Sequence, residues 1–242
     1  MNSIFKPFLR KFVLVFFDDI LIYSRSWKDH VQHVDKVLKL LEEKQLYAKT
    51  SKFFFGVQEV EYLGHIVSHE GVKVDPNKIK AIKEWKVPTT IKLLRGYLRL
   101  IVYYRKFFKN YGRITTPLTT LLKKYGFSWT PIATKAFEHL KGSMCLAPVL
   151  ATPDFTKTFI VECDASGNGI GVFLMQEGRP ISFESHPIKG NYLHKAIYEK
   201  EMLAILHALK KWRTYLMGRH FKVKTDHDSL KHFLEQIFSL EE

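Results

Sequence analysis

Two short apolar runs near the start of the chain are separated only by a pair of acidic residues, Asp18 and Asp19. Hydrophobic side chains fill positions 12–17 before the pair and 20–23 after it, which predicts two β-strands joined as a hairpin. Tight hairpin turns favour Asn-Gly or Asp-Gly, because both central residues need a positive φ. No glycine follows the pair here, so Asp-Asp is an uncomfortable choice for a turn.

The stretch that follows changes from a helical to a strand pattern. Apolar residues recur at helical spacing within residues 29–46, which predicts an amphipathic helix. Residues 60–67 and 72–74 flank the stretch Ser-His-Glu-Gly and are rich in valine and other strand-forming residues. We expect these two runs to form a second hairpin.

Helices dominate the middle of the chain. Asp75 followed by Pro76 predicts a helix start, with the aspartate as cap and the proline at the first helical position. Further helical segments are expected up to about residue 124, and Thr115-Thr116-Pro117 is expected to open one of them. Two prolines within residues 148–153 then mark a linker.

After this linker the pattern becomes that of an α+β domain. The strongest helical periodicity of the chain covers residues 198–216, and Gly218 is expected to end that helix. Ser229 is expected to open a last helix. Gly167, Gly169 and Gly171 lie between strand patterns and open no helix, so they predict a tight hairpin with close backbone approach. The expected strands are residues 158–164, 169–176, 181–184 and 221–226.

The charge of the chain is concentrated in its middle. The 242 residues carry a formal net charge of +14 and have a sequence pI of about 9.6. Between residues 78 and 124, thirteen Lys or Arg stand against one acid, Glu84, with aromatic residues interleaved. Cations beside stacking groups suit a nucleic-acid partner. The alternative is a solvated helix face over an aromatic core.

The cysteines and the N-terminal stretch indicate in which cellular compartment the protein is expected. Cys145 and Cys163 lack disulfide or zinc-cluster spacing, which suits a reducing compartment. The N-terminal stretch contains two carboxylates and no small-residue cleavage site, and no apolar run reaches the length of a membrane span. We expect a soluble, intracellular protein of the cytoplasm or nucleus, without a membrane partner.

Four motifs, in order and covering almost the whole chain, resemble the polymerase polyprotein of gypsy-type (Metaviridae) long-terminal-repeat retrotransposons. FVLVFFDDILIYS is similar to the reverse transcriptase palm motif, and EYLGHIVSHEGVKVDPNKIKAI to the primer-grip hairpin and thumb. YYRKFFKNYGRITTPLTTLLKK resembles the thumb and connection, and FIVECDASGNGIGVFLMQEGRPISFES the start of a ribonuclease H domain. The resemblance implies an α+β chain: a palm remnant at 1–75, a basic helical thumb and connection at 76–150, and an incomplete ribonuclease H-like mixed sheet with helices at 151–242.

In the palm, the resemblance implies that Asp18 and Asp19 are catalytic and bind Mg²⁺ for nucleotidyl transfer. Paired carboxylates on a rigid hairpin suit hard divalent ions that neutralise the attacking and leaving oxygens. The family's third aspartate comes from an earlier strand, which the chain is expected to lack, so we predict no RNA-directed DNA synthesis. The alternative is a pair of solvated turn aspartates.

In the ribonuclease H part, the resemblance assigns the catalytic and metal-binding carboxylates to Asp164, Glu201 and Asp226. The two aspartates end strands and the glutamate lies on a helix, an arrangement that suits two Mg²⁺ ions, with Mn²⁺ as a substitute. The family's fourth acid is expected beyond residue 242, so we predict that endonuclease activity on RNA/DNA hybrids is weak or lost. Taken alone, Glu201 also fits a surface glutamate.

The resemblance and the basic segment together imply binding of RNA/DNA hybrid, DNA or RNA, and association with a fuller polymerase. Two alternatives stay open, a non-catalytic nucleic-acid-binding remnant and a non-functional pseudogene product. The predicted nucleic-acid contacts are Tyr62, Gly64, Lys83, Lys92, Arg95, Arg105, Lys106 and Lys109.

Overall fold

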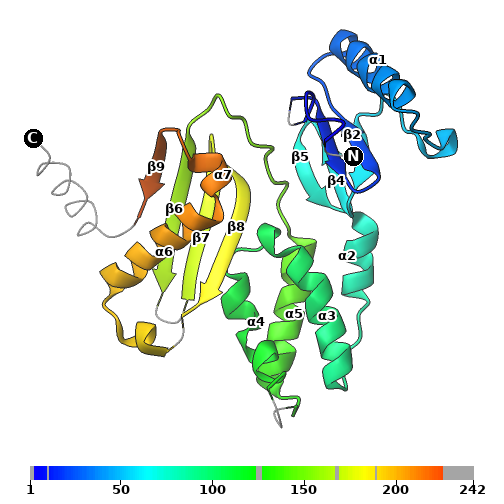
Figure 1. Ribbon diagram of the computed structural model, residues 1–242. Helices are drawn as coiled ribbons and strands as arrows, with labels where there is room; N and C mark the ends of the chain where they lie inside the picture. Colours follow the sequence, from blue (N-terminus) through cyan, green and yellow to red (C-terminus); the bar gives the residue numbers. More distant parts are fainter. Residues whose placement is uncertain (1–2, 10, 124–126, 167–168, 189, 226–242) are drawn as a thin grey trace, which may run out of the picture. The chain divides into compact units, whose positions relative to one another are not determined.

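The structure is a computed structural model that describes residues 3–9, 11–123, 127–166, 169–188 and 190–225 (Figure 1). It contains two compact units, Met1–His69 and Glu70–Glu242. None of the helices within these described ranges is long and apolar enough to cross a membrane.

The acidic pair of the first unit lies on the predicted hairpin. Strands β1 (Val13–Phe16) and β2 (Asp19–Ile22) pair antiparallel, with Phe16 opposite Asp19. Phe17 takes the positive φ of the turn, 52°, a conformation that bulky residues rarely adopt. The hairpin prediction is confirmed. Asp18 lies in the turn of the hairpin, and Asp19 is the first residue of β2.

Helix α1 (Trp27–Glu43) gives this unit its small core. Ser26 caps the helix, because its hydroxyl accepts the backbone N–H of Asp29 at 3.1 Å. Val37 and Leu41 are buried on one face of the helix and pack with apolar side chains from the N-terminal segment and the hairpin. The helix begins two residues before the predicted start at residue 29.

The run over residues 60–67, expected as one arm of a hairpin, divides into two strands. Strand β3 (Glu59–Tyr62) turns back into β4 (His65–Ser68), and the two pair antiparallel with Tyr62 opposite His65. Leu63 and Gly64 form the turn with φ of 52° and 68°. Two successive residues at positive φ match the twist of a hairpin, and glycine adopts the second of them without strain.

The second unit begins with strand β5 (Gly71–Val74) and a helical core. Helix α2 (Pro76–Lys83) starts as predicted, with the Asp75 carboxylate accepting the backbone N–H of Asn77 at 2.8 Å. The core is formed by apolar faces of α2, α3 (Ile91–Tyr103), α4 (Tyr111–Thr120) and α5 (Pro131–Cys145), together with the 3₁₀ turn η2 (Arg105–Phe107). Its fully buried members include Leu94, Tyr97, Ile101, Phe107, Leu118, Phe137 and Leu140.

The prediction that Thr115-Thr116-Pro117 opens a helix is also wrong, because these residues lie inside α4. The helix starts after Asn110, which has a φ of 58°. The Thr115 hydroxyl donates to the carbonyl of Tyr111 at 2.9 Å, so it bonds back into the helix and does not cap its start. The first turn of the helix is bonded to a residue distant in sequence: the buried Gly112 donates its N–H to the Ser185 hydroxyl at 2.6 Å.

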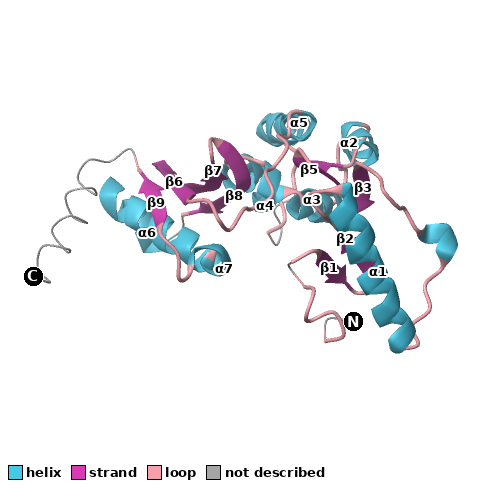
Figure 2. Ribbon diagram, turned by 90° about the horizontal axis from the view of Figure 1, so that it is seen from above, coloured by secondary structure: helices cyan, strands magenta, loops and turns pink. Residues whose placement is uncertain are grey.

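A mixed four-stranded sheet follows, in the order β8-β7-β6-β9. Strands β6 (Phe159–Ser166), β7 (Gly169–Gln176) and β8 (Arg179–Pro187) are antiparallel neighbours, and β9 (Phe221–Lys224) runs parallel to β6. A parallel pair needs a crossover connection. Helix α6 (Ile197–Lys211) provides it and covers one face of β6 and β7 (Figure 2). The α+β prediction is confirmed.

Several details of this part differ from the sequence prediction. The expected helix over 198–216 divides at the buried Trp212 into α6 and the short α7 (Arg213–Leu216). The third strand, β8, is longer than residues 181–184. Ser166 pairs with Gly169, as the predicted tight hairpin requires. The helix expected from Ser229 lies outside the described residues.

The segment expected to be a linker, residues 148–153, is hydrogen-bonded to two different strands through two adjacent residues. Leu150 and Val72 exchange main-chain hydrogen bonds of 2.8 and 2.9 Å, and Ala151 donates its N–H to Pro180 at 2.7 Å. Gly71 makes this close approach feasible, because an added Cβ would lie 2.1 Å from the Leu150 carbonyl oxygen, and its φ of +133° disfavours other residues. The segment is therefore an anchored crossing between the helical core and the sheet.

Candidate active site and nucleic-acid interface

Two of the three predicted nuclease acids lie within the described residues. Asp164 lies on the central strand β6, where it pairs with Gly171 of β7, and it is half-buried. Glu201 lies on α6, and Asp226 lies outside the described residues. Within the described part of the chain, no three His, Cys, Asp or Glu side chains form a cluster that could hold a metal ion.

Glu201 is not a solvated surface residue. Its side chain is buried, with 4% of the residue exposed, and the Thr225 hydroxyl donates a hydrogen bond to its Oε2. Thr225 directly follows β9 and immediately precedes Asp226 in the sequence. A buried carboxylate costs several kcal/mol unless it is hydrogen-bonded or paired. The hydrogen bond therefore ties α6 to the carboxyl end of β9.

The carboxylate of Glu201 also lies close to the central strand. Burial, and then the negative charges of Glu201 and Glu162, raise the pKa of the Cys163 thiol to about 12. Cys163 directly precedes Asp164 on β6. The structure thus places Glu201 close to the strand that carries Asp164 and close to Thr225, the residue before Asp226. Successive side chains of a strand alternate, so those of Cys163 and Asp164 leave β6 on opposite faces of the sheet.

In the first unit, Asp18 and Asp19 are both exposed at the hairpin. Burial, and then the Asp19 carboxylate, raise the pKa of the Tyr62 hydroxyl. Tyr62 ends β3, and Gly64 lies in the turn that follows. Asp19 and Tyr62, two of the predicted site residues, are therefore close enough to interact electrostatically.

Part of the basic segment forms a solvent-facing surface. Lys83 lies in the last turn of α2, and Lys92 and Arg95 lie in the first turns of α3; all three are exposed. The opposite face of α3 is buried in the core through Leu94 and Tyr97. We call Lys83, Lys92 and Arg95 the exposed basic face. This face leaves its cations accessible to phosphate.

The other predicted basic contacts are engaged with their own unit. The Arg105 guanidinium lies 3.7 Å from the Glu184 carboxylate, which also pairs with Lys211 of α6 at 3.0 Å. The Lys109 ammonium lies 4.7 Å from the centre of the Phe173 ring. Burial lowers the pKa of Lys106. A contact of these three residues with nucleic acid stays a prediction.

Two residues of the site were not found from the sequence. Glu184 is 7% exposed and pairs with cations from two separate elements, and Thr225 binds Glu201. A single acid in a strand carries no sequence signal of its buried pairing. For Thr225 the only signal was its position directly before a predicted metal ligand.

The region with the acidic hairpin and the region with the sheet and its crossover helix each match a family of domains found in reverse transcriptases. Residues 1–67 match the reverse transcriptase (RNA-dependent DNA polymerase) family, and residues 129–223 match the RNase H-like domain found in reverse transcriptase. A foamy viral protease-reverse transcriptase solved with double-stranded DNA matches 97% of this chain and 42% of its own, with a TM-score of 0.87 and 23% identity. The same viral enzyme solved with an RNA/DNA hybrid matches 93% of this chain and 31% of its own, with a TM-score of 0.84. These likenesses show the fold.

Sequence relatives narrow the class. The chain is 41% identical to the retrovirus-related Pol polyprotein from transposon 297 of Drosophila melanogaster over 96% of its length, and 37% identical to that from transposon gypsy over 95%. It is 35% identical to the transposon Tf2-3 polyprotein of Schizosaccharomyces pombe over 95%. The chain belongs to the gypsy-type retrotransposon Pol family, as the sequence motifs predicted. It spans 22%, 24% and 18% of the length of these three relatives.

Proposed function

We propose that the chain binds RNA/DNA hybrids and keeps a weak cleavage activity on their RNA strand, through a ribonuclease H centre built on Asp164, Glu201 and Asp226. The observation that carries this proposal is the buried Glu201 carboxylate, which is hydrogen-bonded by Thr225 and lies beside strand β6. A carboxylate held in this way is costly for folding alone and useful for chemistry.

The donor groups of this centre have the chemistry that a divalent metal ion requires. Asp164 and Glu201 supply carboxylate oxygens, and Asp226 adds a third carboxylate in the sequence directly after Thr225. Hard ions such as Mg²⁺ prefer such ligands. When bound, a pair of ions would supply a nucleophilic water and stabilise the leaving oxygen of the cleaved strand. The protein holds the Glu201 side chain in position through the Thr225 hydroxyl.

The exposed basic face supports nucleic-acid binding. Lys83, Lys92 and Arg95 present positive charge from one helical core, and phosphate neutralisation by such residues releases counterions. The viral enzymes with the same fold were solved with double-stranded DNA and with an RNA/DNA hybrid. In the first unit, Asp18 and Asp19 are exposed on a rigid hairpin and suit divalent-metal binding in the same way.

Cleavage of a labelled RNA/DNA hybrid in Mg²⁺ tests the catalytic part of the proposal. Glu201→Gln keeps the size of the side chain and removes its charge, so cleavage is expected to fall by at least about a hundredfold. Glu199→Gln is the matched control on the same helix, because Glu199 pairs with Lys195 at 2.6 Å on the surface. The control is expected to cleave like the wild type.

Binding of the same hybrid is measured in parallel as a function of salt concentration. A steep fall of affinity with salt supports the phosphate-contact surface. Binding without cleavage would reject the nuclease and leave a non-catalytic nucleic-acid-binding module. Cleavage that is equal in the wild type and Glu201→Gln would show that the activity does not arise from this centre.

A further inference from the structure

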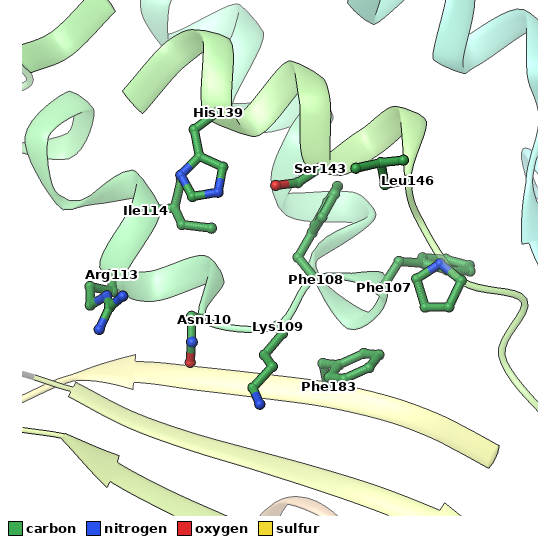
Figure 3. Close-up of a pocket in the computed structure, with 11 residues that line it drawn as sticks. Phe107, Phe108, Lys109, Asn110, Arg113, Ile114, His139, Ser143, Leu146 and Phe183 are labelled. Carbon is green, nitrogen blue, oxygen red and sulfur yellow. The ribbon is translucent and has the colours of Figure 1, made fainter. Parts of the chain in front are cut away.

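A pocket of about 340 Å³ opens in the second unit, and none of the carboxylates of the candidate centre is among the residues that line it. It lies where the turn at residues 107–110 meets α4, α5 and β8 (Figure 3). The figure shows His139 of α5 and Ile114 of α4 on the helical side, and Phe183 on the strand side. The volume is at the lower end of the range for small-molecule sites.

The residues that line the pocket are of two kinds, apolar and basic. Its walls are mostly apolar, and Phe183 contributes a half-buried aromatic ring. Arg113 and His139, both exposed, come from two different helices, and the Lys109 ammonium is the third basic group of the lining. None of the described residues that line the pocket carries a carboxylate. A ligand with a flat ring and an anionic group therefore complements it.

We propose that this pocket binds one nucleoside monophosphate unit, with its base against the apolar walls and its phosphate at Arg113 and His139. A base can stack on an aromatic or apolar wall whatever its sequence. Guanidinium and imidazole groups donate hydrogen bonds to phosphate oxygens. Lys109 contributes less to the phosphate, because its ammonium already lies over the Phe173 ring.

The ligand can come from two sources with the same chemistry. One is a free nucleotide, and the other is an unpaired nucleotide at the end of a strand whose duplex part is bound by the chain. The second source rests on the proposed function, since it requires that the chain binds a duplex. The first source does not require this, so the two ideas can fail separately.

The test uses the full chain and three probes. Adenosine monophosphate is titrated by isothermal calorimetry, and two labelled RNA/DNA hybrids, one blunt and one with a single unpaired nucleotide, are titrated by fluorescence anisotropy. We expect saturable binding of the mononucleotide and an affinity about threefold to tenfold higher for the hybrid with the unpaired nucleotide.

Two variants tie the result to the pocket. Ser143→Phe adds bulk at a residue that lines the pocket, and Arg113→Gln removes an exposed charge at the pocket without touching the core. Lys135→Phe and Lys135→Gln are the matched controls, because Lys135 is exposed on the same helix α5 and does not line the pocket. Each pocket variant is expected to lose about tenfold in mononucleotide affinity, and the controls less than about twofold.

The outcomes separate the two proposals. Mononucleotide binding that both pocket variants weaken, in a protein that does not bind duplex, would support the pocket and reject the proposed function. Duplex binding without mononucleotide binding, and without preference for the unpaired end, would reject the pocket alone. Nucleotide binding that Arg113→Gln leaves unchanged would also reject it, and this variant decides the matter if Ser143→Phe unfolds.

Discussion

The basic segment has a first half, around α2 and the start of α3, whose cations face solvent, and a second half, around residues 105–109, whose cations contact the sheet. Lys83, Lys92 and Arg95 project from α2 and α3 into solvent, whereas Arg105 and Lys109 contact the sheet. Both halves combine cations with aromatic residues in sequence. The difference arises from what lies opposite each half: the second one meets the buried Glu184 carboxylate and the Phe173 ring. Positive charge along a chain thus predicts a surface only where no acid or ring of the same protein lies within reach.

The largest effect is expected from removing the acid that pairs with two cations. Glu184→Ala leaves Arg105 and Lys211 without their shared partner and is expected to lower the free energy of unfolding by about 2 kcal/mol, measured by urea denaturation. The two cations are partly exposed, so the loss stays below that of a fully buried pair.

The matched control is Glu177→Ala. Glu177 pairs with Lys157 at 2.7 Å, and both side chains are largely exposed, so the cost is expected to be below about 0.5 kcal/mol. Equal losses for Glu184→Ala and Glu177→Ala would show that the contact between Arg105 and the sheet does not stabilise the fold.

The double variant Lys92→Ala/Arg95→Ala removes two cations of the exposed basic face. Affinity for an RNA/DNA hybrid at low salt is expected to fall about fivefold to tenfold, and the slope of log K against log salt to decrease by about two units, because two phosphate contacts are lost. The free energy of unfolding should not change. Arg105→Ala should show the reverse, with a larger loss of stability than of affinity. A similar profile for both variants would remove the distinction between the two halves.

A smaller effect is expected for the cation over the aromatic ring. Lys109→Met keeps the length of the side chain and removes its charge, so the interaction with Phe173 is lost at a cost of about 0.5–1 kcal/mol in unfolding free energy. Lys86→Met changes an exposed lysine outside this contact and should be neutral. A neutral Lys109→Met would place the Lys109 charge among those available to bind nucleic acid.

The smallest effect is a dependence of stability on pH near the buried acid. Burial lowers the pKa of His207, outweighing the opposite effect of Glu184, while His186, Lys211 and Arg105 lower it further. Because the pKa is lower in the folded than in the unfolded chain, stability is complete above the unfolded value and is lost as the pH falls below it. The wild type should therefore lose more unfolding free energy between about pH 7.5 and 5.5 than His207→Gln does. Equal losses would contradict the shift.

The sequence predicted the parts of the molecule that depend on local pattern. The two apolar runs around the acidic pair located the first hairpin, and Asp75-Pro76 located the start of α2. The candidate nuclease carboxylates were predicted from the family resemblance, and the structure adds that Glu201 is buried.

Features that depend on contacts distant in sequence were missed. Helix α4 starts before its Thr-Thr-Pro run, and its second residue, Gly112, bonds Ser185, a residue seventy-three positions later. The turn at Leu63 and Gly64 was missed because a leucine at positive φ is rare. The pairing of Arg105 with Glu184 could not be anticipated, since charge pattern does not specify partners.

The main-chain bridge between Val72 and Leu150 has a consequence for how the protein can be divided. It joins β5, the first strand of the second unit, to Leu150, which follows the last helix of the helical core. A piece covering residues 70–151 therefore has its two ends next to each other. Segments with adjoining ends and their own apolar core are suited to excision and to circular permutation. The adjoining ends suit the helical core to relinking or to exchange between relatives, with Gly71 kept at its entrance. Excision alone would remove the contacts of Arg105 and Gly112 with β8.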